Sequence, residues 1–159
     1  MREEPKYRIC ERALTVWRIS GIISSMILWV AFFVLWSVAA LFQWSDWIVV
    51  IALIIVVVNT FLEIFIFPRL RWKRWRYEVH EHEIDIQRGM FVVRRTIVPM
   101  VRVQHVDTSQ GPLLRKYRLA NVSISTAATI HEIPALDIEE AEQLRDRISI
   151  LARVTDKDE

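Results

Sequence analysis

Glycine and cysteine are both scarce in this sequence of 159 residues, and each shortage excludes a class of protein. The three glycines are Gly21, Gly89 and Gly111, so neither the G-x-G-x-x-G dinucleotide fingerprint nor the G-x-x-x-x-G-K-[ST] phosphate loop can be written. Cys10 is the single cysteine, which excludes an internal disulfide framework and every multi-cysteine zinc or iron–sulfur pattern. Nucleotide-loop enzymes are therefore excluded, and a domain that faces a reducing cytosol is favoured.

Net charge is also nearly absent, because 21 Lys and Arg residues stand against 19 Asp and Glu residues, for a formal charge of +2. A nucleic-acid-binding domain normally carries a strong basic excess, so we expect no nucleic-acid partner. Apolar residues, in contrast, make up 53% of the sequence, while the charged fraction of 25% is ordinary. These averages predict that the chain separates into one apolar part and one charged part.

Two long apolar runs account for the apolar excess. No ionisable side chain occurs between Ile19 and Ser45, a run of 27 residues. A helix of that length would reach about 40 Å, more than the roughly 30 Å hydrocarbon core of a bilayer. The run is longer than a signal-peptide core and lacks an A-x-A cleavage site, so we expect it to stay in the membrane. A second run, Trp47–Phe67, is also long enough to span, and we expect Pro68 to end it.

The link between the two runs is so short that the two helices must be antiparallel. The sequence therefore predicts a transmembrane hairpin over residues 19–67, with spans at about 19–42 and 47–67. Basic residues gather at the outer ends of the hairpin, whereas its tip carries only Asp46. By the positive-inside rule we expect the N-terminal segment 1–18 and both termini to be cytoplasmic. The basic residues behind this prediction are Arg2, Lys6, Arg8, Arg12, Arg18, Arg69, Arg71, Lys73, Arg74 and Arg76.

Asn59 and Glu63 are the polar interruptions of the second span and form a candidate intramembrane pair. Their i, i+4 spacing places them on one side of a helix, opposite roughly Ser24–Ala31 of the first span. Small residues there, including Gly21, allow close helix approach, and serine hydroxyls could accept or donate hydrogen bonds to the pair. A carboxylate at this depth indicates either a proton or ion relay, or a structural group that pins helices or reaches the headgroups. We favour the structural interpretation, because a two-helix hairpin offers no second acid and no evident pathway.

Short stretches rich in β-branched residues follow from about Arg71 onward. The strands that we expect are Tyr77–Val79, Ile84–Arg88, Phe91–Val98, Arg102–Asp107, Leu119–Ser125 and Thr129–Ile133. We expect a tight turn at Gly89-Met90 and a short helix or loop over Gly111–Tyr117. Asp137 predicts a helix cap, with Glu140 three positions on as in a capping box, before an amphipathic helix that runs to about 154. The pattern predicts a small bent sheet or open barrel covered by one helix, with a frayed tail at 155–159.

The strongest surface signal is a basic and aromatic segment directly after the second span. Interleaved arginine, lysine and tryptophan beside a membrane favour contact with anionic headgroups, although the same charges also serve as the stop-transfer signal that sets topology. The predicted anionic-lipid contacts are Arg69, Arg71, Trp72, Lys73, Arg74, Trp75 and Arg76.

Other candidate chemistry is weak. His80 and His82 lie in a polar stretch that reads as a hairpin turn, and a metal site would need further ligands, such as His105 or His131, brought close by the fold. No motif places a nucleophile beside a base, so we expect neither an enzyme nor a cofactor. Arg88, Arg94, Arg95 and Arg102 could form another basic patch, but strand alternation would send Arg94 and Arg95 to opposite faces.

The run V-R-V-Q-H-V-D-T-S-Q-G-P-L-L-R over Val101–Arg115, followed by L-A-N-V-S-I-S-T-A over Leu119–Ala127, resembles the signature of bacterial pleckstrin-homology-like (PH-like) membrane proteins, the YdbS-like family. The resemblance covers nearly the whole chain. It implies a cytoplasmic PH-like barrel of about seven strands over residues 69–154, capped by a C-terminal helix and attached to the two-helix transmembrane hairpin in a bacterial cell membrane. Where the family pattern has glycine before Leu-Ala this chain has Arg118, so the local turn geometry is in doubt if that glycine serves a positive-φ turn.

The resemblance also implies a function. Family members are expected to assemble with a larger membrane protein that carries several PH-like domains, and to act in envelope defence against antimicrobial compounds. PH domains that bind phosphoinositides use basic residues around their first hairpin, whereas here that hairpin would be the acidic turn His80–Glu83. Our leading hypothesis is thus a non-enzymatic membrane assembly protein, as a hetero- or homo-oligomer. The alternatives are a transport or ion-conducting component that uses Glu63 and Asn59, and a sensor of anionic headgroups.

Overall fold

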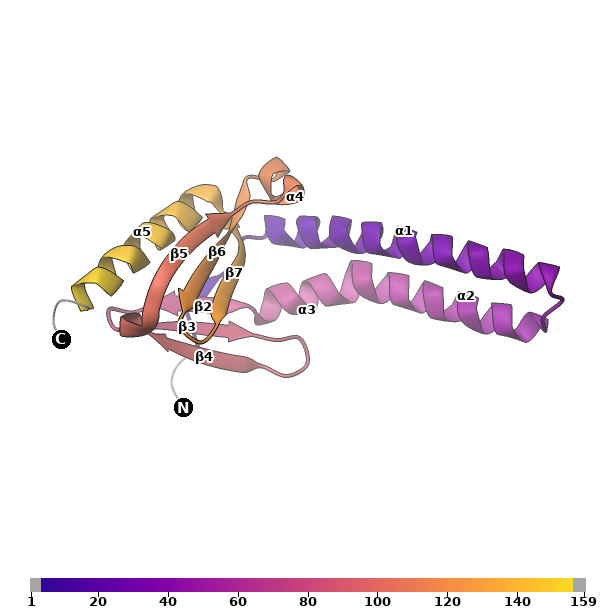
Figure 1. Ribbon diagram of the computed structural model, residues 1–159, viewed down its shortest axis with the longest axis horizontal. Coiled ribbons are helices and arrows are strands. Elements are labelled where there is room, and N and C mark those ends of the chain that lie inside the picture. The colour runs from indigo at the N-terminus through magenta and orange to yellow at the C-terminus, as the bar shows by residue number, and fades with distance from the viewer. Residues whose placement is uncertain (1–3, 156–159) are drawn as a thin grey trace. The chain divides into compact units, whose positions relative to one another are not determined.

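The fold is taken from a computed structural model, which describes residues 4–155 of the chain. The chain forms two compact units, whose elements are labelled in Figure 1. The helical hairpin comprises Trp17–Leu70. The sheet unit comprises the N-terminal residues up to Val16 together with the residues from Arg71 onward. The described residues of the N-terminal segment up to Val16 therefore belong to the sheet unit.

Two long helices supply the hairpin. Helix α1 (Arg12–Leu41) and the continuous helical run Asp46–Arg74 are each long and apolar enough to cross a membrane. The second run consists of α2 (Asp46–Phe61), a π-helical segment η1 (Leu62–Ile66) and α3 (Phe67–Arg74). Between α1 and α2 the chain reverses at Gln43, whose φ of 51° is left-handed. The predicted pair of antiparallel apolar helices is confirmed.

The expectation that Pro68 ends the second helix is wrong. Helical structure continues through Pro68 to Arg74, and the residues just before the proline widen into a π-helical turn in which the Phe67 amide donates to the Leu62 carbonyl. A proline in a regular helix lacks one amide donor and crowds the carbonyl four residues earlier. A wider turn relieves that crowding, which accounts for the position of η1 directly before Pro68.

The hairpin buries few side chains of its own. Its buried apolar residues are Phe32, Ala39 and Val56, while most of its other large apolar side chains are exposed. The two helices are joined by a side-chain hydrogen bond from Trp29 Nε1 to Thr60 Oγ1 at 3.2 Å. The outward surface is therefore apolar, as expected of helices that meet lipid.

Two antiparallel sheets form the sheet unit. The first has the order β1-β2-β3-β4, with β1 (Tyr7–Arg8), β2 (Arg76–Val79), β3 (Glu83–Arg88) and β4 (Arg94–Pro99). The second has the order β5-β6-β7, with β5 (Val103–Ser109), β6 (Leu119–Thr126) and β7 (Ile130–Asp137). A 3-10 turn, η2 (Met100–Arg102), joins the sheets, and helix α4 (Pro112–Lys116) lies between β5 and β6. Helix α5 (Ile138–Thr155) packs along β5, β6 and β7 (Figure 1).

The core lies between the sheets and α5. Successive residues of a strand point to opposite faces, and in β6 the alternating residues Ala120, Val122 and Ile124 are buried, as is Leu119 at the start of the strand. The other large side chains that are fully buried are Ile84, Ile86, Met100, Ile133, Leu136 and Ile148. The described residues thus form seven strands capped by a C-terminal helix, which confirms the predicted architecture.

Strand boundaries differ from expectation at several points, including β1, which was not expected, and β7, which runs on to Asp137; the largest consequence is at the loop between β3 and β4. The sequence predicted a strand from Phe91, but β4 begins only at Arg94, and residues 89–93 form a loop. Gly89 has a φ of +134°, a backbone conformation that favours glycine. A Cβ at this position would collide with the backbone of Val92, so the loop folds back closely on itself. The predicted two-residue turn is therefore a longer loop with an apolar tip.

The predicted cap of the last helix is confirmed, but its predicted capping box is wrong. Asp137 Oδ1 accepts a hydrogen bond from the Glu139 amide at 3.2 Å, and its other carboxylate oxygen pairs with Arg12. Glu140, expected to complete a capping box, instead accepts a hydrogen bond from Tyr77. Of the tail expected to fray, Thr155 ends α5, and residues 156–159 lie outside the described residues, as does Arg2.

Arg118 occupies a left-handed backbone position, with a φ of 55°. Its amide donates to the Arg115 carbonyl at 3.2 Å, and its carbonyl accepts from the Ile138 amide at 3.1 Å, so the turn is fixed on both sides. The turn thus keeps the conformation that glycine favours although an arginine is present.

We predict that Arg118→Gly raises the free energy of unfolding by about 0.5–1 kcal/mol, because glycine adopts positive φ without a Cβ clash. The measurement is the urea unfolding midpoint of the full chain in detergent. Arg118→Ala removes the same side chain but keeps the clash, so it should give no gain; equal stabilisation by both variants would contradict the backbone explanation.

Candidate functional site

The basic segment after the second span is only partly turned outward. Arg69, Lys73 and Arg74 are exposed on α3. Trp72 donates its Nε1 hydrogen to the Ile9 carbonyl at 3.0 Å, and Trp75 is only 6% exposed. Trp72 therefore binds the N-terminal segment, and Trp75 packs in the core of the sheet unit.

Arg76 belongs to β2 and pairs with Glu4 at 2.8 Å. The charge of Arg76 is thus partly neutralised by a carboxylate of the sheet unit. The lipid contacts of the segment stay a prediction, and its outward basic residues are Arg69, Arg71, Lys73 and Arg74.

A basic cavity of about 470 Å³ opens beside the loop between β3 and β4. Three arginines line it, and Glu132 is the one carboxylate among its lining residues. Asn121 donates to Glu132 Oε1 at 2.6 Å. The lining residues are Arg71, Trp75, Arg88, Gly89, Met90, Val92, Arg94, Glu132 and Pro134. The sequence suggested Arg88 and Arg94 as members of a basic patch, but not that Arg71 and β7 join them, because these segments are far apart along the chain.

Arg94 and Arg95 point to opposite faces of β4, as strand alternation predicted. Arg94 lines the basic cavity, whereas Arg95 binds the buried carboxylate of Asp85, with Nε–O distances of 2.9 and 3.0 Å. The side chain of Asp85 is 4% exposed, and this hydrogen-bonded ion pair raises the pKa of Arg95. Burying a carboxylate requires such a partner, so Arg95 is a structural residue.

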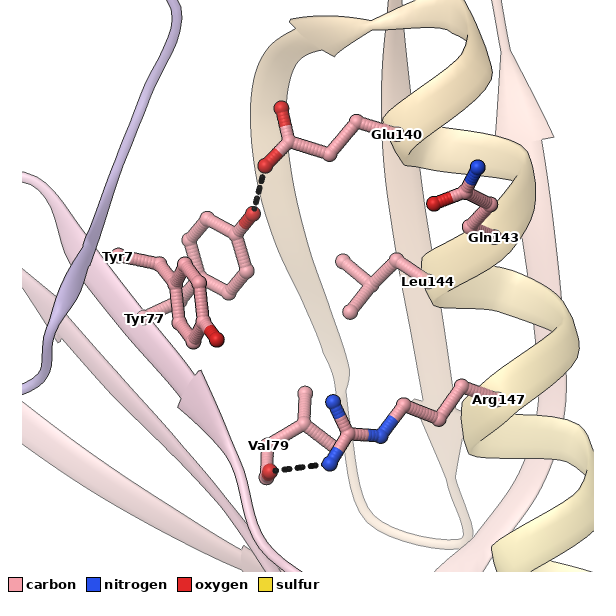
Figure 2. A pocket seen from close by; sticks show the side chains of 7 residues that line it. All are labelled: Tyr7, Tyr77, Val79, Glu140, Gln143, Leu144 and Arg147. Atoms are coloured by element: carbon pink, nitrogen blue, oxygen red, sulfur yellow. Dashed lines mark hydrogen bonds between the residues drawn. The ribbon is translucent and has the colours of Figure 1, made fainter.

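A small tyrosine-lined pocket of about 220 Å³ lies between β1, β2 and α5 (Figure 2). The rings of Tyr7 and Tyr77 stack with centroids 5.8 Å apart, and Tyr77 donates its hydroxyl hydrogen to Glu140 Oε1 at 2.8 Å. Arg147 donates to the Val79 carbonyl at 3.4 Å. Burial and the Glu140 carboxylate raise the pKa of Tyr77, so the phenol stays protonated. Its hydrogen bond to Glu140 then connects the first sheet to α5.

A longer groove of about 580 Å³ follows the outer side of β5 along α5. β5 is the edge strand of its sheet, and most of its residues are exposed. An edge strand has backbone amides and carbonyls with no strand beside them. The groove is lined by Val101, Val103, Gln104, His105, Val106, Ser149, Ala152 and Arg153.

The intramembrane pair lies where the helices come close. A Cβ on Gly21 would sit 2.8 Å from the backbone oxygen of Glu63, so the two helices touch at this point. Serine hydroxyls were expected to bind the pair, but Ser25 Oγ and Glu63 Oε2 are both buried without a hydrogen-bond partner among the described residues. Arg18 Nε is a third such atom, and Asn59 is half-buried.

The histidines show no metal arrangement. The described residues contain no group of three or more His, Cys, Asp or Glu residues that could hold a metal ion. The turn between β2 and β3 is closed by the His80 amide, which donates to the Glu83 carbonyl at 2.9 Å. Burial, with a smaller effect of Arg88, lowers the pKa of His131.

Comparison with known proteins assigns this architecture. Residues 12–152 match the family described as Bacterial PH domain. The chain is 56% identical over 158 residues to the UPF0699 transmembrane protein YdbS of Bacillus subtilis (strain 168), an alignment that covers 99% of both chains. The chain belongs to the YdbS-like family of bacterial PH-domain proteins.

A second relative of this YdbS-like family member is the UPF0699 transmembrane protein YdbT of the same bacterium. It is 28% identical over 83 residues, which are 50% of this chain and 17% of YdbT. One bacterium thus contains a full-length counterpart of the chain and a second PH-like protein of which the chain matches a small part. No solved structure matches the chain.

We predict that Gly21→Leu in this YdbS-like protein destabilises the hairpin by about 1–3 kcal/mol, because the new side chain would meet backbone rather than a movable side chain. The measurement is the loss of helical circular dichroism of the detergent-solubilised chain with rising sodium dodecyl sulfate. Ser20→Leu, at the exposed neighbouring position, is the matched control and should unfold as the unaltered chain does. Equal behaviour of the two variants would contradict close packing at Gly21.

Proposed function

We propose that the chain is a non-enzymatic membrane assembly protein whose sheet unit binds a larger membrane protein with PH-like domains. The observation that carries the proposal is the open edge of β5 beside α5. An extended segment can add to such an edge through backbone hydrogen bonds, while its side chains enter the neighbouring groove. The groove of about 580 Å³ has the room for side chains of such a segment.

The nature of the groove supports a protein partner. Valine side chains from η2 and β5 line one wall of the groove, and Ser149 and Ala152 of α5 line the other. Arg153 adds a positive charge to the lining of the groove. Interfaces typically combine an apolar centre with a polar rim. The existence of YdbT beside YdbS supports a partner of the same PH-like kind.

The test uses a Bacillus subtilis strain in which the tagged chain replaces YdbS. After extraction in mild detergent we expect YdbT to co-purify with the chain, and tagged YdbS serves as the positive control. Recovery of YdbT with YdbS but not with this chain would contradict the proposal, and so would the absence of YdbT from both. An envelope-defence role further predicts that the strain grows in the antimicrobial compounds that a strain without YdbS fails to tolerate.

We predict that Ala152→Trp lowers recovery of YdbT at least tenfold, because the indole would fill the groove between α5 and β5. Glu142→Trp places the same side chain at an exposed position of α5 outside that groove and should leave recovery unchanged. The measurement is the ratio of YdbT to tagged chain after purification. Full recovery with Ala152→Trp would show that the partner binds elsewhere.

Orientation is part of the proposal, with both termini in the cytoplasm. We predict that Ser45→Cys in a Cys10→Ser background reacts with a membrane-impermeant maleimide on protoplasts, whose plasma membrane is intact, because the hairpin tip would face outward. Lys116→Cys in the same background should react only after the cells are permeabilised. Labelling of Lys116→Cys in intact protoplasts would show the opposite orientation, with the sheet unit outside the cell.

A second candidate function is ion conduction through Glu63. The observation that favours it is that Glu63 Oε2 is buried without a hydrogen-bond partner among the described residues, since intramembrane carboxylates in that state often mark proton pathways. The test is proton flux into proteoliposomes that hold the full chain. Flux that is lost in Glu63→Gln would support conduction, and the absence of flux in the unaltered chain would exclude it.

A further inference from the structure

We propose that the basic cavity beside the β3–β4 loop binds the phosphate of an anionic phospholipid headgroup, while the tip of that loop enters the bilayer interface. The site is distinct from the groove along β5, since the two share no lining residue. The inference does not depend on the proposed assembly.

The charge of the cavity fits an anion. Arg71, Arg88 and Arg94 line it against the single carboxylate of Glu132. Arg88 and Arg94 form no ion pair with any residue in the described part of the chain, and both are exposed. Guanidinium groups bind phosphate oxygens through paired hydrogen bonds, and two or three of them converge on such a group readily.

The walls and rim of the cavity fit a lipid rather than a soluble anion. Trp75, Met90, Val92 and Pro134 contribute apolar surface between the arginines. At the tip of the loop Phe91 is 77% exposed and Val92 71% exposed. Large apolar side chains so exposed beside arginines match the interface of a bilayer, where rings and aliphatic groups sit below the phosphates.

The connectivity of the chain supplies the third argument. Arg71 lies four residues after Phe67, the last apolar residue of the second run, which is about 6 Å along a helix. One of the arginines that line the cavity therefore lies only a short stretch of chain from the apolar membrane run. Because the sheet unit is covalently tethered to the membrane helices, its cavity meets headgroups at a high local concentration.

The backbone of the β3–β4 loop and the pairing of its flanking strands bring Arg88 and Arg94 together at the cavity. Gly89 at φ +134° folds the loop so closely that any side chain there would collide with Val92. Arg95, the next residue after Arg94, is held by Asp85 and does not belong to the cavity. The two arginines that flank the loop, Arg88 and Arg94, are paired across β3 and β4, so their side chains start from neighbouring positions.

The test uses the full chain in nanodiscs, with Cys10→Ser and Phe91→Cys labelled by an environment-sensitive fluorophore at the loop tip. Nanodiscs of phosphatidylcholine are compared with nanodiscs that contain increasing phosphatidylglycerol. We expect emission to rise and shift to the blue with phosphatidylglycerol, and native mass spectrometry to show phosphatidylglycerol retained over phosphatidylcholine. A signal and retention that do not depend on phosphatidylglycerol would overturn the proposal.

The variants make the test specific. Arg88→Gln with Arg94→Gln should weaken the apparent phosphatidylglycerol affinity about 25-fold, because each basic residue near a bilayer contributes about fivefold. Arg115→Gln with Lys116→Gln removes the same charge from exposed α4 and should leave the affinity within twofold. Val92→Asp, with both arginines kept, should prevent the blue shift. Unchanged affinity in the first variant, or an equal loss in the α4 control, would overturn the site.

Discussion

The pairing of the N-terminal segment with the strand after the second span is the contact on which the rest of the structure depends. Tyr7 stacks on Tyr77, Trp72 binds the Ile9 carbonyl, and Arg12 binds both Asp137 and the Tyr117 carbonyl, at 3.1 Å for the latter. Residues on both sides of the hairpin thus belong to one folded unit. The sheet unit is therefore built from two chain segments that are separated in the sequence by the whole hairpin, and its folding must bring these two segments together.

The arginines of the sheet unit divide into those that form ion pairs within the unit and those that do not. Arg12, Arg76 and Arg95 each pair with a carboxylate of that unit, so they stabilise the fold. Other arginines of the described residues are exposed without a carboxylate partner, and two of these, Arg88 and Arg94, flank the loop between β3 and β4. A nearly neutral chain can in this way present a local positive field, since opposite charges cancel in the sum and not in space.

Local patterns were enough to predict the spans, most strands and the cap at Asp137, because each depends on the periodicity or chemistry of neighbouring residues. What the sequence did not reveal depends on distant partners. Nothing near Tyr7 indicates that it pairs with β2, and Glu140 looks like a capping residue until Tyr77 is placed beside it. The basic cavity joins Arg71, the β3–β4 loop and β7, so no window of the sequence contains it.

Pro68 shows how local rules fail within a membrane helix. In water a helix that meets proline usually ends, because the freed carbonyl can bind solvent. In a bilayer an unsatisfied carbonyl costs several kcal/mol, so the backbone instead widens to a π turn and continues to Arg74. That continuation carries Arg71 to the sheet unit on an unbroken helix. A chain that ended its helix at Pro68 would have placed Arg71 on irregular backbone, and the wall of the cavity that Arg71 forms would have been less well defined.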